Sequence, residues 1–411
     1  MEDRISRRDF LKAGLATRAI PALLVSSPQT SSQRVLDLAE WSYLWIGLER
    51  IKGSNGWIIS GRQMYVEYQT PKRLRHGYPI VLMHGAGGQG SDWMSAPDGR
   101  PGWASYLLLE GYSVYIVDLP GMGRVPYHTE LHGPYGPAPV YEAMERTLRT
   151  ARHHTQWPGT GEIGDPALDQ LMASRGQMPW DAARAREVWR AGGAALLDTI
   201  GPSIFLTHGA GAAVAWLAAD ARPGAVKGIV AMEPGMKSDG PLLQAPSNLS
   251  RVPVSVVSAE ASQGRARDDV QASAFSRSGA RVDHIQLDKH GVRGNGHFIM
   301  LEKNNREALQ PILKWMDARI PPPSAAAAAR PRPPASKEST AVVLSDQGGF
   351  WVGVRRKSVA YGTVAEGQAF VQFAIPAKLR HPYPVVLVHG GGGQGIHWMG
   401  ESEGHAGWAH Y

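Results

Sequence analysis

Four short segments of the chain carry residues that could do chemistry, and each lies next to an apolar run. They are HGAGG (84–88), DLPGMG (118–123), THGAG (207–211) and GNGHF (294–298). Glycine lets the backbone approach a ligand closely, so the N–H groups of such loops can stabilise negative charge. The histidine of the last segment, His297, can transfer a proton. The pattern predicts a site that combines anion stabilisation with proton transfer.

Glycine-rich loops that follow strands are also typical of phosphate sites, but the motifs of those sites are absent. No Walker-type Lys-Ser/Thr is present, and no G-x-G-x-x-G is followed by an acidic residue about 20 positions on. The sequence has 0 Cys, which excludes disulfides, a thiolate nucleophile and a Cys-based zinc site. With no metal-ligand cluster either, we expect neither a metal nor an organic cofactor.

The elements that must position these segments alternate between strand and helix. Short apolar runs predict strands at 65–70, 79–84, 113–121, 203–208, 226–234, 252–260 and 280–287. Helical patterns occupy 103–112, 212–223 and 305–319. Strand followed by helix, repeated, predicts an α/β fold with a mostly parallel sheet flanked by helices. Residues 126–200 interrupt the alternation, and we expect them to form an inserted helical cap.

In order and spacing the four segments resemble the α/β-hydrolase superfamily over nearly all of residues 35–319. More narrowly, they are similar to secreted bacterial esterases whose nucleophile elbow reads T-H-S-x-G and whose triad acid follows the sixth strand. The resemblance implies hydrolysis of a small-molecule ester and a ligand that is an ester or resembles a carboxylic acid. It also implies an oxyanion hole formed by the backbone of Gly85 and Ala86 together with the N–H of Ala210.

The same resemblance implies a base and an acid. His297 has the position of the family's general base, and His290 is the nearest alternative. Two carboxylates could orient the base. Glu233 ends a predicted strand at the carboxyl edge of the sheet, where such sites gather, and Glu260 is near the position that most α/β-hydrolases use. We favour Glu233 and keep Glu260 as the alternative.

The nucleophile position of the elbow is occupied by glycine. Aligning T-H-S-x-G with residues 207–211 puts Gly209 where the serine belongs, so no acyl-enzyme can form there. An elbow holds this residue in a strained backbone conformation that glycine adopts without penalty. We therefore expect Gly209 to remove the activity while leaving the fold intact.

An internal repeat divides the chain. YVEYQTPKRLRHGYPIVLMHGAGGQGSDWM (65–94) returns as FVQFAIPAKLRHPYPVVLVHGGGGQGIHWM (370–399), 305 residues later. We interpret this period as a duplicated domain rather than a solenoid. We expect a first hydrolase domain at 35–319, a Pro/Ala-rich linker at 320–340, and the truncated N-terminal part of a second hydrolase domain at 341–411.

The charge distribution and the N-terminal segment indicate which partners and which cellular compartment to expect. The net charge is +7, but much of the excess lies in residues 1–30 and 318–340, so we expect no nucleic-acid partner. SRRDFLK (6–12) precedes a modestly apolar run, and residues 1–33 resemble a twin-arginine export signal. No stretch reaches the ~18–20 apolar residues of a membrane span. We expect a periplasmic or extracellular protein.

Two functional hypotheses follow. In the first, the chain is related to serine esterases and its first domain is catalytically degenerate because of Gly209. In the second, that domain is a non-catalytic ligand-binding or scaffold domain, with an intramolecular partner domain in a longer chain that carries the active site.

Overall fold

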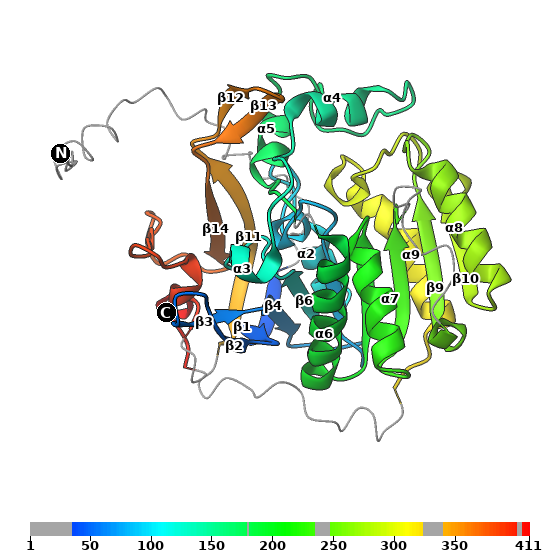
Figure 1. Ribbon diagram of the computed structural model, residues 1–411, viewed down its shortest axis with the longest axis horizontal. Coiled ribbons are helices and arrows are strands. Elements are labelled where there is room, and N and C mark those ends of the chain that lie inside the picture. The colour runs from blue at the N-terminus through cyan, green and yellow to red at the C-terminus, as the bar shows by residue number, and fades with distance from the viewer. Residues whose placement is uncertain (1–34, 179–180, 235–246, 324–339, 401–404) are drawn as a thin grey trace. The chain divides into compact units, whose positions relative to one another are not determined.

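One ten-stranded sheet organises the part of the chain that the computed structural model describes, residues 35–178, 181–234, 247–323, 340–400 and 405–411 (Figure 1). Its order is β10-β9-β8-β7-β5-β6-β4-β1-β11-β14. The strands are β1 (Leu36–Ile46), β4 (Met64–Pro71), β5 (Ile80–Met83), β6 (Val114–Asp118), β7 (Ser203–His208), β8 (Val226–Met232), β9 (Pro253–Ser258), β10 (Arg281–Gln286), β11 (Val342–Val352) and β14 (Ala369–Pro376). The expected export signal at 1–33 and most of the expected linker at 320–340 lie outside the described residues.

The six strands from β10 to β6 run parallel, as the alternation of strand and helix predicts. Their continuous apolar sequences suit a sheet that is covered on both faces. In β5, Ile80 and Leu82 belong to one core cluster, and Val81 and Met83 belong to the other. The mostly parallel α/β architecture expected from the sequence is confirmed.

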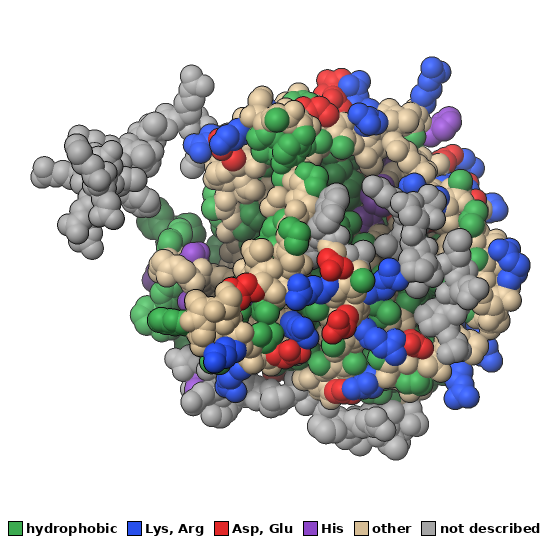
Figure 2. Space-filling view, viewed as in Figure 1, with side chains coloured by type: hydrophobic (Ala, Val, Ile, Leu, Met, Phe, Trp, Pro, Cys, Tyr) green, Lys and Arg blue, Asp and Glu red, His purple; other side chains and the backbone are tan. Residues whose placement is uncertain are grey.

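Helices cover both faces of this parallel half. Core residues of α2 (Trp103–Leu109) and α9 (Asn305–Arg319) pack on one face, and those of α6 (Ala182–Ile200), α7 (Gly211–Ala221) and α8 (Arg265–Arg277) pack on the other. Ion pairs such as Arg222–Asp198, at 2.6 Å, connect α7 to α6 on the surface. Figure 2 shows acidic and basic side chains interspersed on the face that this view presents.

The other four strands are antiparallel and join the two repeats. β1 pairs with β4, and it also pairs with β11 through Leu36↔Leu344, Asp37↔Val343 and Leu38↔Val342. At this end of the repeat the offset is 306 residues, since Trp45 corresponds to Trp351. Asp37 therefore lies opposite its own repeat counterpart, Val343. This pairing has a local twofold symmetry, in which the first strand of each repeat pairs with the other.

The region 126–200 contains three short helices and one long one. The short helices are α3 (Thr129–His132), α4 (Tyr141–Arg149) and α5 (Pro166–Ala173). The local sequence determines where α5 begins, because the side chain of Asp165 accepts the N–H of Ala167 and Pro166 occupies the first turn. The long helix α6 packs against α7 on the sheet. The segment that precedes α6, residues 126–178, is called the insert below.

Two small hairpins project from the antiparallel strands. β2 (Glu49–Lys52) pairs with β3 (Ile58–Gly61), and β12 (Arg355–Val359) pairs with its neighbour β13 (Gly362–Glu366). They are repeat counterparts in the sequence. Single turns of 3-10 helix complete the structure at η1 (Gly90–Trp93), η2 (Ser247–Arg251), η3 (Leu287–His290), η4 (Ile299–Leu301), η5 (Gly395–Trp398) and η6 (Trp408–His410).

Candidate active site

Gly209 occupies the turn between β7 and α7 in a left-handed backbone conformation, with φ of +49°. Its N–H donates to the carbonyl of Met232 at 2.9 Å, which ties the turn to the end of β8. A Cβ built on Gly209 would meet only the Cα of Gly85, at 3.7 Å, an ordinary contact. A side chain at position 209 would therefore have space but would hold a strained backbone.

The loop after β5 lies against this turn. Gly85 is buried, and a Cβ there would come within 2.6 Å of the Nδ1 atom of His208, so the loop needs glycine to approach the elbow. Ala86 is exposed and Ala210 is half-buried. In the described chain neither N–H donates to a protein acceptor. Of the three residues of the predicted oxyanion hole, Ala86 and Ala210 thus have N–H groups that could donate to a ligand.

Glu233 follows β8 and is buried, with a φ of +50° that is unusual for a residue with a side chain. Its Oε1 accepts the N–H of Ala259 at 2.7 Å, and its Oε2 accepts a short hydrogen bond from the hydroxyl of Ser262. The left-handed conformation costs of order 1–3 kcal/mol, and such strain persists only where surrounding contacts hold it. These contacts fix the carboxylate in one place.

His297 lies beside this carboxylate. Its Nδ1 atom is 3.6 Å from the Oε2 of Glu233, and about a third of its side chain is exposed. Glu260, the alternative acid, instead faces Arg293 at 3.3 Å and accepts the N–H of Gly294 at 3.0 Å. His290, the alternative base, is exposed at the end of η3. The structure thus brings together His297 and Glu233 and places Glu260 and His290 elsewhere.

His208 is not among the residues that the sequence predicts for the site, but its side chain contacts the backbone of the loop that carries His297. Its Nε2 atom lies 3.0 Å from the carbonyl oxygen of His297, and since a carbonyl only accepts, Nε2 carries the proton. Burial, followed by the nearby charge of His297, holds the pKa of His208 well below its ordinary value. His208 is therefore a neutral donor that anchors the backbone of His297. Its only sequence signal is its place immediately before Gly209.

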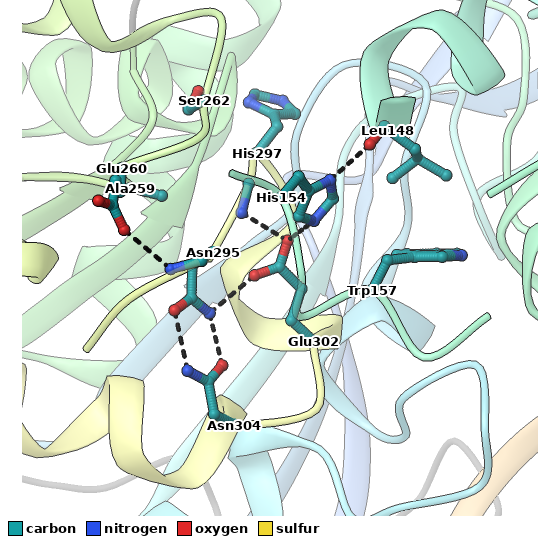
Figure 3. A network of polar contacts seen from close by, with 12 residues as sticks. Leu148, His154, Trp157, Ala259, Glu260, Ser262, Asn295, His297, Glu302 and Asn304 are labelled. Atoms are coloured by element: carbon teal, nitrogen blue, oxygen red, sulfur yellow. Dashed lines mark hydrogen bonds and ion pairs between the residues drawn. The ribbon is translucent and has the colours of Figure 1, made fainter. Parts of the chain in front are cut away.

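The insert binds the same loop through a buried ion pair (Figure 3). His154 lies 2.7 Å from Glu302, and both side chains are almost fully buried. Glu302 also accepts the backbone N–H of Gly296 at 2.8 Å and a hydrogen bond from the side-chain Nδ2 of Asn295 at 2.7 Å. Burial lowers the pKa of His154, but the hydrogen bond and charge of Glu302 outweigh burial, and the net pKa is raised. The pair joins the insert to the residue that precedes His297.

A second contact joins the insert to the glycine-rich loop. The N–H of Gly176 donates to the carbonyl of Gly87 at 2.7 Å. The neighbouring Arg175 makes a short, buried ion pair with Asp92, and its guanidinium lies 5.8 Å from the centre of the Phe298 ring. The insert therefore contacts both loops of the candidate site.

Two further features are absent from the described residues. No group of three or more His, Cys, Asp or Glu side chains among them is arranged to hold a metal ion. No helix in the same part of the chain is both long enough and apolar enough to cross a membrane.

A mostly parallel sheet with a strand–turn–helix elbow at Gly209, a histidine loop after the last parallel strand and an acid after β8 defines an α/β-hydrolase fold. No family model matches the chain. It is 33% identical over 312 residues to the probable secreted lipase phiG of a fungal species (strain ATCC 74256), a match covering 62% of this chain and 85% of that protein. The chain therefore belongs to the lipase and esterase family of α/β-hydrolases that includes this secreted lipase.

A solved structure shows the same fold. A structure described as a novel bacterial esterase superposes with a TM-score of 0.59 at 23% identity, and the match covers 71% of this chain and 99% of that one.

Proposed function

We propose that residues 35–319 form an esterase-family domain that keeps the base, the acid and the oxyanion donors of ester hydrolysis but has lost the nucleophile. Gly209 carries this proposal, because it has the elbow's left-handed conformation and open space for a side chain. The domain would bind a small ester or a carboxylic acid without forming an acyl-enzyme.

The remaining groups have defined tasks if a hydroxyl is present at position 209. The Nδ1 atom of His297 faces Glu233, which leaves Nε2 to take the hydroxyl proton. Glu233, buried and held by Ala259 and Ser262, would stabilise the imidazolium that forms. The N–H groups of Ala86 and Ala210 would stabilise the developing oxyanion. Loss of a nucleophile of this kind costs about 10⁶ in turnover.

A chromogenic short-chain ester tests the proposal. We expect Gly209→Ser to hydrolyse it at least about 10³-fold faster than the parent protein, a fraction of what a nucleophile contributes. Gly209→Ala is the matched control, since it introduces the same backbone strain without a hydroxyl, and it should gain nothing. Adding His297→Ala to Gly209→Ser should return the rate to the parent level. Equal rates in the parent and the serine variant would instead favour water activated directly by His297.

We also propose that the protein is exported. Residues 1–33 carry the twin-arginine pattern, and the fungal relative is named a secreted lipase. A reporter fused behind residues 1–33 should leave the cytoplasm of a bacterium with a twin-arginine pathway. It should stay inside when Arg7 and Arg8 are both replaced by Lys, and export of that double variant would contradict the proposal.

A further inference from the structure

The hairpin β12–β13 of the second repeat lies against the insert helices α4 and α5 (Figure 1). Its strand β13 contributes Thr363, whose N–H and hydroxyl donate to the two carboxylate oxygens of Glu142 at 3.0 and 2.7 Å. Glu142 is in the first turn of α4. One residue of the hairpin thus satisfies both oxygens of one residue of the insert.

An ion pair forms a second connection, between the hairpin and α5. The guanidinium of Arg356 contacts both oxygens of Asp169, with Nε 2.9 Å from Oδ1. The hydroxyl of Tyr141 in α4 donates to the same Oδ1 at 2.9 Å. Asp169 therefore holds α4, α5 and the hairpin together. Both charged side chains are partly shielded from solvent, with 35% and 22% exposed for Arg356 and Asp169.

The strand β11 adds a third connection. The side-chain amide of Gln170 donates to the carbonyl of Trp351 at 2.9 Å and accepts the N–H of the same residue at 2.8 Å. This pair of bonds imitates the pairing of a β-strand. The second repeat thus contacts three insert residues, Glu142, Asp169 and Gln170, through specific polar groups.

The insert also contacts the candidate site, so it links the second repeat to that site. His154 follows α4 and donates from Nδ1 to the carbonyl of Leu148, the last turn of that helix, at 2.7 Å. The N–H groups of Thr155 and Gln156 donate to the carbonyl of Gly294 at 2.9 and 3.2 Å. A continuous set of contacts therefore leads from the hairpin through α4 to the loop that carries His297.

We infer that the second repeat acts as an intramolecular partner of the insert, and that Arg356 and Thr363 are positioning residues for the candidate site. The hairpin fixes α4 and α5, and these helices fix the residues that hold the loop of His297. The inference rests on the proposed function only where activity is measured. Its structural part concerns how well ordered the loop is, and it does not depend on whether the protein catalyses a reaction.

Charge reversal tests the coupling through hydrogen exchange. Asp169→Arg or Arg356→Asp alone places like charges together, and each should raise the exchange rates of the Thr155 and Gln156 amides about threefold or more. The double exchange of the two charges should restore protection. Arg222→Asp breaks a bidentate pair with Asp198 on α6 and is the matched control, expected to leave these amides unchanged. Unchanged exchange in the single variants, or no recovery in the double variant, would overturn the inference.

A milder change and an activity readout complete the test. Thr363→Val removes the hydroxyl bond to Glu142 without changing charge, and it should raise the same two exchange rates. This variant decides the question if the charge-reversal variants fold poorly. In the Gly209→Ser background, each single variant should lower kcat more than it raises KM, with recovery in the double exchange. If Gly209→Ser itself is inactive, the proposed function fails, and hydrogen exchange alone still decides the coupling.

Discussion

At the scale of single residues, the proposed site lacks only a nucleophile side chain, at position 209. Glu233 and Gly209 share an unusual left-handed backbone, and they lie at the ends of the adjacent strands β8 and β7. Glu233 keeps its strain because Ala259 and Ser262 hold the carboxylate. At Gly209 the strain is absent, since glycine adopts this conformation freely. Under the proposed function, replacement of the nucleophile by glycine would thus relieve strain at position 209, while Glu233 keeps its strained backbone.

Restoring a side chain at position 209 should therefore lower stability. We expect Gly209→Ser and Gly209→Ala each to reduce the free energy of unfolding by about 1 kcal/mol, because both place a Cβ in a left-handed conformation. The built Cβ meets only one atom, so a larger loss from a clash is not expected. Urea denaturation measures the loss. A serine variant as stable as the parent would show that the elbow relaxes to another conformation.

Part of this site could be predicted from the sequence. The motif GNGHF and the acid at the end of a strand led to His297 and Glu233, which the structure places 3.6 Å apart. His154 could not be found in this way, because its partner Glu302 lies 148 residues further along the chain. A lone histidine in an insert has no pattern that separates a buried partner from a surface residue. Only the folded chain brings the two together.

At the scale of elements, sequence periodicity predicted best where burial is uniform, as in β7, or regularly amphipathic, as in α9. β7 and α9 have the bounds expected from the sequence, whereas α2 ends at Leu109, before the expected end at 112. The helix α8 was missed because charged residues crowd its first turns and its apolar pattern is weak. The strand β1 was missed as well, and its alternation of buried and exposed residues is irregular. Tertiary contacts, rather than local pattern, define these two elements.

The connection between the insert and the His297 loop should depend on pH. The raised pKa of His154 means that its ion pair with Glu302 stabilises the fold fully below the ordinary value of 6.5, and that this contribution is lost as pH rises through the raised pKa. We expect His154→Gln to cost about 1.5–3 kcal/mol at low pH, typical of a hydrogen bond to a charged group. The difference from the parent protein should shrink as pH rises.

Urea unfolding of both proteins between about pH 5.5 and 9 measures this difference. A difference that is constant, or that grows as the pH rises, would contradict a protonated His154 in the folded state. Glu260→Gln is a suitable comparison, because Glu260 holds the same loop through Gly294 without contacting His154.

At the scale of the whole molecule, the sheet of an α/β-hydrolase continues into the second repeat. Across β1, the side chains of Gln69 in β4 and Gln347 in β11 exchange hydrogen bonds of 3.1 and 2.7 Å, and both are buried. Together with the pairing of Asp37 and Val343, this contact makes the second repeat part of the same core. The repeat was visible in the sequence, but its place in the sheet was not.

The glutamine pair provides a test of this shared core. Gln69→Leu or Gln347→Leu alone leaves a buried amide without its partner and should cost about 1–3 kcal/mol of unfolding free energy. The double variant should cost less than the sum, because it removes both polar groups. Strictly additive losses in urea denaturation would show that the two side chains do not interact in solution.

We propose that position 209 is a nucleophile position whose supporting groups are intact. Reaction with a fluorophosphonate, which modifies activated serines, followed by peptide mass spectrometry, tests it most directly. Gly209→Ser should gain one adduct, on the residue at position 209, and the adduct should disappear when His297→Ala is added. The parent protein should remain unmodified. An adduct on the parent protein, or none on a folded Gly209→Ser variant, would show that position 209 is not a nucleophile position of this kind.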